Sequence, residues 1–149
     1  MLIHEELPQY DSWVRLLYLI PFGLFIAAMF LAYSNEYEGF LVLIGEGALV
    51  GLIFYFIMPR KYQIYQNKLR IVLGTPFGVD IPLATIKEVK RASGFKAYVY
   101  SGVRFATSSR NIVEIVRSRG LNYVISPQNV DFFIERFNEA VKSRPHERR

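Results

Sequence analysis

Residues 121–143, LNYVISPQNVDFFIERFNEAVKS, contain a short apolar run that leads directly into an amphipathic segment. The run NYVI, with its β-branched and aromatic residues, is typical of a strand. Ser126 is predicted as the N-cap of a helix, and Pro127 suits the first helical position. Apolar residues then recur every three or four positions, which predicts a helix with one buried face. The residues of this face are Val130, Phe133, Ile134, Phe137 and Val141.

The region upstream of this helix alternates apolar and polar residues from Tyr62 onward. A turn is predicted at Gln66 and Asn67, because Asn tolerates the positive φ that a tight hairpin needs. Pro82 indicates a sheet edge or a bulge. Strands are expected within residues 61–74, 78–91, 95–109 (around a turn at 101–102) and 110–127. About seven short antiparallel strands followed by one helix predict a mainly-β roll or small barrel capped by a C-terminal α-helix.

Two long apolar segments precede the β region. Residues 14–33 carry one charge, Arg15, and residues 40–58 carry one, Glu46. About 20 helical residues cross a hydrocarbon core of ~30 Å, so both segments are long enough to span a membrane. Since only the six residues SNEYEG separate them, they predict a transmembrane helical hairpin. A cleaved signal peptide is the alternative for the first segment, but the leader before it is acidic and a second segment follows at once.

The positions of Lys and Arg predict the orientation of this hairpin. SNEYEG contains neither residue, whereas Arg15 begins the first segment and Arg60 and Lys61 follow the second. The positive-inside rule therefore places both termini in the cytoplasm of a multi-pass protein of the cell membrane. The expected parts are an N-terminal cytoplasmic tail (1–13), the hairpin (14–58), a β domain (60–142) and a basic tail (143–149).

Three stretches of the β domain carry a resemblance to a known family. They are YQIYQNKLRIVLG, IPLATIKEVKR and, above all, LNYVISPQNVDFFIERF, in which the last strand runs through ISP into the helix. Residues 60–142 thereby resemble the bacterial pleckstrin-homology (PH-like) domains, many of which follow one or two N-terminal membrane helices. The resemblance implies a non-catalytic adaptor or oligomerising module. Eukaryotic members that bind phosphoinositides gather cations in their first loop; here that loop is QNK with one cation, Lys68, so no ligand residue is carried over.

Glu46 lies between two glycines in the second apolar segment. A carboxylate inside a membrane is costly unless it is protonated, paired or directed into a polar cavity. Gly47 and Gly51 form a GxxxG pattern, which lets two helices approach closely. We therefore expect Glu46, Gly47 and Gly51 to be helix-packing residues, with Glu46 hydrogen-bonded at a helix contact that supports self-association. Proton or cation handling by Glu46 and snorkelling of its carboxyl to the outer face are the alternatives.

The β domain and the tail behind it are strongly basic. Residues 60–149 hold 17 Lys and Arg against 7 Asp and Glu, a net charge of +10. Each well-placed cation contributes about 1 kcal/mol at an anionic leaflet. The residues expected to contact the membrane surface are Arg60, Lys61, Lys87, Lys90 and Arg91. A solvated basic face and an acidic protein partner are the alternatives; nucleic acid is not expected, because aromatics in alternating strands are usually core residues.

The sequence offers little for catalysis. There is no Cys, and the two histidines, His4 and His146, lie near opposite ends of the chain. Thr107, Ser108 and Ser109 form a polar turn with no evident base. No catalytic residue, metal ligand, cofactor or small-molecule substrate is expected. The sequence predicts a membrane-anchored binding or scaffold module that acts by protein–protein contact or self-assembly. The alternatives are an ion- or proton-handling subunit using Glu46 and a sensor of anionic lipid.

Overall fold

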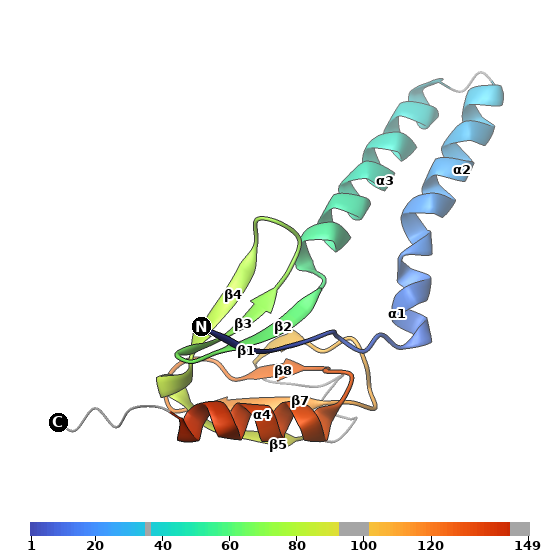
Figure 1. Cartoon of the computed structure of the whole chain (residues 1–149). Helices are drawn as coiled ribbons and strands as arrows, with labels where there is room; N and C mark the ends of the chain where they lie inside the picture. The colour runs from blue at the N-terminus through green and yellow to red at the C-terminus, as the bar shows by residue number, and fades with distance from the viewer. Residues whose placement is uncertain (35–36, 93–101, 144–149) are drawn as a thin grey trace. The chain divides into compact units, whose positions relative to one another are not determined.

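The computed structural model describes residues 1–34, 37–92 and 102–143. The chain divides into two compact units (Figure 1). One unit, here called the hairpin, is Ser12–Met58, and the other, here called the β unit, combines Met1–Asp11 with Pro59–Arg149. The hairpin is therefore an insertion between the first eleven residues and the rest of the β unit.

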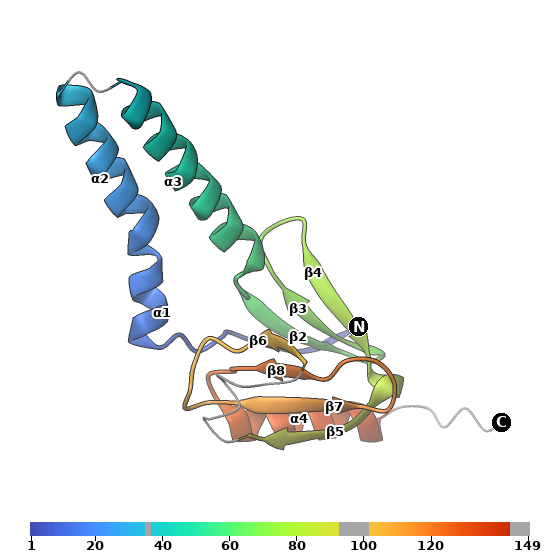
Figure 2. The ribbon, with the colours of Figure 1, turned by 180° about the vertical axis from the view of Figure 1, so that it is seen from behind.

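The hairpin consists of antiparallel helices that lie side by side in both views (Figures 1 and 2). The helices are α1 (Ser12–Leu17), α2 (Leu19–Tyr33) and α3 (Tyr37–Ile57). The stretches Ser12–Tyr33 and Tyr37–Ile57 are long and apolar enough to cross a membrane, with mean hydropathies of 2.2 and 2.3. Few of their residues are buried within the chain, unlike the core helix of a soluble protein.

The first sheet of the β unit has four antiparallel strands in the order β1-β2-β3-β4. They are β1 (Leu2–Glu6), β2 (Lys61–Tyr65), β3 (Lys68–Val72) and β4 (Gly78–Pro82). The predicted turn at Gln66 and Asn67 joins β2 to β3. Alternate residues of these strands are fully buried, namely Tyr62, Ile64, Leu69, Ile71 and Ile81. Pro82 ends the edge strand β4, where the missing N–H is tolerated.

Strand β1 differs from the sequence-based expectation of a tail over residues 1–13. Its residues Glu5 and Glu6 pair with Gln63 and Tyr62 of β2, across the whole hairpin insertion. The segment LIHEE lacks the alternation that marks a half-buried strand, since only Glu6 is buried. Its strand character comes from the free edge of β2, which no local pattern in the sequence reveals.

The second sheet has the order β5-β7-β8-β6. Its strands are β5 (Ile86–Arg91), β6 (Val103–Phe105), β7 (Val113–Arg117) and β8 (Tyr123–Ile125). A short 3-10 turn, Leu83–Thr85, connects the sheets. The pairing of β7 with β8 is antiparallel, as predicted, but β6 runs parallel to β8. The strand predicted just before residue 101 lies outside the described residues.

Helix α4 (Val130–Lys142) closes the core between the two sheets and packs against β1, β2 and β5. Its N-cap is Asn129, whose side chain accepts a hydrogen bond from the Phe132 N–H at 3.1 Å. The predicted cap, Ser126, is instead buried and donates from its hydroxyl to the Ser108 carbonyl. The helix starts later than expected, and its buried face comprises Val130, Phe133, Phe137 and Ala140. Val141, predicted in this face, is 40% exposed.

Candidate functional site

The chain passes between the β unit and the hairpin at one end of the first sheet. The Tyr10 hydroxyl donates a hydrogen bond to the carbonyl of Pro59, which joins the segment that enters the hairpin to the segment that leaves it. The Arg60 N–H then donates to the Val72 carbonyl at 2.7 Å, at the end of β3. We call this part of the β unit the junction end; the opposite end holds the turn of residues 66–67.

Backbone hydrogen bonds tie the N-terminal segment to the second half of the β unit. The Gln9 N–H donates to the Ser126 carbonyl at 2.7 Å, and the Thr107 hydroxyl donates to the Gln9 carbonyl at 2.6 Å. The Asp11 N–H donates to the Thr107 carbonyl at 3.0 Å. Residues 1–11 are thus an integral part of the fold up to the residue before α1.

The carboxylate of Asp11 organises the turn of residues 107–110. One oxygen accepts from the Ser108 hydroxyl at 2.7 Å, and the other accepts from the N–H and the hydroxyl of Ser109 at 2.7 and 2.9 Å. Partial burial raises the pKa of Asp11, but the hydrogen bonds from Ser109 and Ser108 and the charge of Arg110 outweigh it and lower the pKa below its usual value. The ionised carboxylate therefore stabilises the junction end.

We expect this carboxylate to give the β unit an acid-side pH dependence. A pKa that folding lowers adds stability above the unfolded pKa, and the added stability is lost as pH falls through the folded pKa. Asp11→Asn should lower the free energy of unfolding by about 1–2 kcal/mol at neutral pH. The difference between the wild type and the variant should begin to shrink below about pH 4, the ordinary pKa of aspartate, and should be lost as pH falls through the lower folded pKa.

The measurement is hydrogen exchange of core amides in the full-length protein over a pH series. Asp131→Asn is the matched control, because Asp131 is exposed and its ion pair with Arg91 lies at the surface. An equal loss in both variants, independent of pH, would contradict the role given to Asp11.

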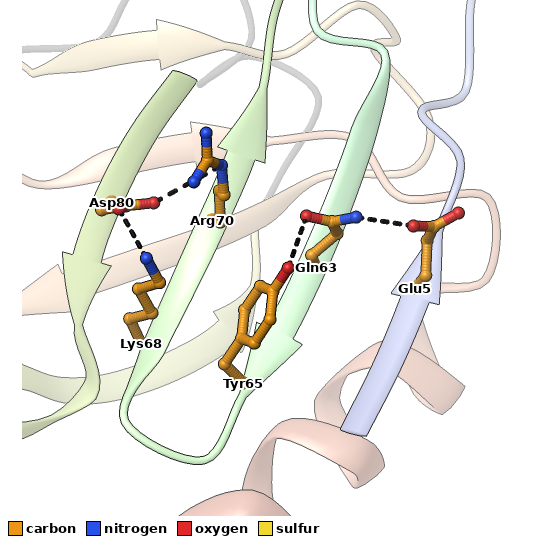
Figure 3. A network of polar contacts seen from close by, with 6 residues as sticks. All are labelled: Glu5, Gln63, Tyr65, Lys68, Arg70 and Asp80. Atoms are coloured by element: carbon orange, nitrogen blue, oxygen red, sulfur yellow. Dashed lines mark hydrogen bonds and ion pairs between the residues drawn. The ribbon is translucent and has the colours of Figure 1, made fainter. Parts of the chain in front are cut away.

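A network of polar side chains crosses the outer face of the first sheet (Figure 3). Glu5 accepts hydrogen bonds from Lys61 and Gln63, each at 2.7 Å, and these two bonds lower the pKa of Glu5. Asp80 accepts from Lys68 at 2.7 Å and lies 3.7 Å from Arg70. Much of the positive charge on this face is therefore balanced locally by carboxylates, in exposed pairs that contribute only about 0–1 kcal/mol each.

The buried polar residues of the core serve the fold. The Tyr62 hydroxyl donates to the Phe105 carbonyl at 3.2 Å and accepts from the Ser126 N–H at 3.3 Å. Burial raises the pKa of Tyr62 above its usual range, so the phenol stays protonated. His4 lies 3.2 Å from the Glu6 carboxylate. Within the described ranges, no group of three or more His, Cys, Asp or Glu residues could hold a metal ion.

The five cations predicted to contact a membrane do not form one cluster. Arg60 lies at the junction end and Lys61 begins β2, next to it. Lys87, Lys90 and Arg91 lie on β5, which belongs to the other sheet. Their carboxylate partners differ as well: Lys90 pairs with Glu88 at 3.1 Å, and Arg91 pairs with Asp131 of α4 at 2.8 Å.

The two glycines of the GxxxG pattern face α2 of the same hairpin. A Cβ on Gly47 would lie 3.4 Å from the Phe25 ring and 3.5 Å from the Leu24 side chain. A Cβ on Gly51 would lie 4.0 Å from Pro21. Glu46 is exposed on α3, in contrast to the buried Gly47 beside it. The close approach that the glycines permit is therefore used within one chain, whereas Glu46 is exposed on the hairpin.

Two four-stranded sheets with one C-terminal helix closing the core between them constitute a PH-like fold. Residues 60–141, more than half of the chain, match the family model described as Bacterial PH domain, so the chain belongs to this family. PH domains are generally non-catalytic binding modules. Searches of curated proteins and of solved structures returned no match to this chain. The matched region begins at Arg60, so β1 and Asp11 lie outside it, whereas Ser108 and Ser109, which bond to Asp11, lie inside it.

Sequence reasoning missed Tyr10 and Asp11 as parts of the junction end. The polar run of residues 107–110 was visible as a turn, but nothing marked its partner almost 100 residues earlier. One signal was present in the sequence. An Asp lies just before the first apolar segment, and an unstructured tail would not require a carboxylate at this position. The signal is weak, because the same pattern suits a simple helix cap.

Proposed function

We propose that the protein is a membrane-anchored, cytoplasm-facing binding or scaffold module that acts by protein–protein contact or self-assembly, without catalysis. The observation that carries this proposal is the junction end. Both connections to the apolar hairpin leave from one hydrogen-bonded site of one β unit, at Asp11 and at Pro59. A β unit built from the segments on both sides of the hairpin must lie on a single side of the membrane, and a two-helix hairpin satisfies that requirement.

The cytoplasmic side is supported by charge. Arg60 and Lys61 follow the second apolar helix directly, whereas the connection SNEYEG has no Lys or Arg. We propose Arg60 and Lys61 as the principal contacts with anionic lipid, each worth about 1 kcal/mol. The ion pair of Lys61 with Glu5 is exposed, so Lys61 can exchange this partner for a lipid phosphate at little cost. Lys87, Lys90 and Arg91 on β5, in the second sheet, would add to the basic surface.

A protein partner could bind the β unit by strand addition. β4 is the outer strand of the first sheet, opposite β1, and presents an edge to which an extended peptide could add. On the other side of this sheet, β1 already pairs with β2. The N-terminal segment therefore takes the position beside β2 that a peptide could otherwise occupy.

The proposal is tested by chemical crosslinking of the full-length protein in cells, followed by mass spectrometry of what is attached. We expect a reproducible foreign protein linked through residues 60–142, or links between two copies through the same region. The absence of both kinds of link, with monomeric protein recovered at native expression levels, would contradict a binding or scaffold role.

A second candidate function is ion or proton handling by Glu46, which the exposed position of this residue on α3 favours. We expect Glu46→Gln to leave crosslinked assemblies and membrane insertion unchanged, because a neutral amide can keep a helix-contact hydrogen bond. Glu38→Gln, at the start of α3, is the matched control. A proton or cation flux in vesicles that the wild type supports and Glu46→Gln abolishes would establish ion handling and overturn the scaffold proposal.

A further inference from the structure

The turn between β3 and β4 lies at the junction end of the β unit. Val72 of β3 is opposite Gly78 of β4, and the Val72 carbonyl accepts from the N–H of Arg60. Phe77 immediately precedes Gly78. Neighbouring strands are ~4.8 Å apart, so two strand spacings place the backbone of Phe77 within roughly 10 Å of Arg60. Arg60 in turn follows the last residue of α3 by only three positions.

Phe77 is presented to the outside by a turn that is fixed to the core. The Leu73 N–H donates to the Phe77 carbonyl at 3.2 Å, and the Phe77 N–H donates to the Gly74 carbonyl at 2.8 Å. Leu73 belongs to the main hydrophobic cluster. Phe77 is nevertheless 53% exposed.

Two other exposed apolar residues of the β unit, Phe132 and Leu121, lie outside this turn. Phe132 is 37% exposed, and its ring lies against Arg136 at 4.8 Å and His4 at 5.1 Å. Leu121 is 60% exposed in the turn between β7 and β8. That turn is at the opposite end of the β unit. The Ser118 N–H donates to the Thr85 carbonyl, and two residues before Thr85 the Leu83 N–H donates to the carbonyl of Asn67, which lies in the turn at that end.

We propose that residues 74–77 form a second contact with the bilayer, in which the Phe77 ring enters the interfacial layer. The inference rests on the proposed membrane anchoring. Phe side chains can bury at the boundary between lipid headgroups and acyl chains, and a nearby cation such as Arg60 complements the lipid phosphates. The contact would make a third attachment point in addition to the two chain crossings, and would hold the first sheet with its junction end toward the membrane.

The absence of Cys from the sequence allows a direct test with single spin labels on the full-length protein in nanodiscs containing phosphatidylglycerol. Thr75→Cys places the label in the turn and keeps Phe77. Asn67→Cys labels the exposed turn at the other end of the same sheet, ~17 Å away along five residues of β3. Leu49→Cys labels an exposed position in the middle of α3. The measurement is the accessibility of each label to oxygen and to a water-soluble nickel reagent.

We expect the label at residue 49 to report hydrocarbon, the label at 75 to report the lipid interface and the label at 67 to report water. A label at 75 as accessible to nickel as that at 67, with 49 still in lipid, would overturn this inference alone. A label at 49 that also reports water would overturn the proposed anchoring itself. Adding Phe77→Ala should shift the label at 75 toward water, whereas Leu121→Ala should not; an unchanged label in Phe77→Ala would remove Phe77 from the contact.

Discussion

Phe133→Ala is expected to lower the free energy of unfolding of the β unit by about 3–5 kcal/mol, the range for removing a buried aromatic ring. Phe133 is 0% exposed and lies at the centre of the cluster that joins both sheets to α4. Its ring meets the Tyr62 ring edge-on, with 6.3 Å between the centroids. The surrounding core relaxes only partly when the ring is removed, so the cost includes a cavity as well as the lost burial.

Phe132→Ala is the matched control for this variant. Phe132 is the preceding residue of the same helix, yet it is 37% exposed, so its loss should cost about 1 kcal/mol or less. Hydrogen exchange of amides in β3 and β7 of the full-length protein measures both effects. Equal losses in the two variants would mean that α4 docks with a different face from the one described.

Gly47→Leu is expected to open the helical hairpin, at a cost of about 1–3 kcal/mol for an overpacked contact. A Cβ at Gly47 already lies 3.4 Å from two atoms of the Phe25 ring, so the additional carbons of leucine must push α2 away. Gly45→Leu is the control, because nothing lies within 4 Å of a Cβ at Gly45. Both substitutions add the same side chain to the same helix, two residues apart.

The separation of α2 and α3 can be measured between spin labels at the exposed positions Ile26 and Leu49. We expect it to widen in Gly47→Leu and to stay unchanged in Gly45→Leu. If the separation stayed constant in both variants while oligomers of the wild type dissociated in Gly47→Leu, the GxxxG pattern would instead join separate chains, as the sequence first suggested.

The sequence predicted those elements that local patterns specify. The apolar segments, the turn at Gln66 and Asn67, the pairing of β7 with β8 and the amphipathic character of α4 all follow from periodicity and turn chemistry over a few residues. The boundary of α4 was less predictable. Ser126 and Asn129 are both good N-caps, and the choice of Asn129 depends on the burial of Ser126 against Ser108, a contact that the sequence does not show.

The largest difference concerns the N-terminus. A strand of five residues with two glutamates in succession has no recognisable amphipathic period, and its partner β2 lies beyond two membrane-length helices. The pairing of β1 with β2 can be recognised only when the two ends of the hairpin are known to lie close together. The same holds for Asp11, whose role depends on the distant turn of residues 107–110.

The position of the junction end is relevant to one loop of the PH family. This loop joins the first two strands of the PH domain and binds phosphoinositides in some eukaryotic members. In this chain that loop is the turn between β2 and β3, and it begins at the end of β2 opposite Arg60. Five residues of β2 place it ~17 Å from the point where the chain leaves the hairpin. This position agrees with the scarcity of cations in the loop, where Lys68 is the single cation of the stretch QNK.

The central claim is that residues 1–11 and 59–143 form one β unit on one side of a membrane that the hairpin spans. Its most direct test uses single cysteines at Leu2, Glu38 and Asn67, treated with a membrane-impermeant maleimide before and after the cells are permeabilised. The account predicts that Glu38 is labelled in intact cells, and that Leu2 and Asn67 are labelled only after permeabilisation. Labelling of Leu2 and Asn67 from opposite sides, or of all three from one side, would contradict it.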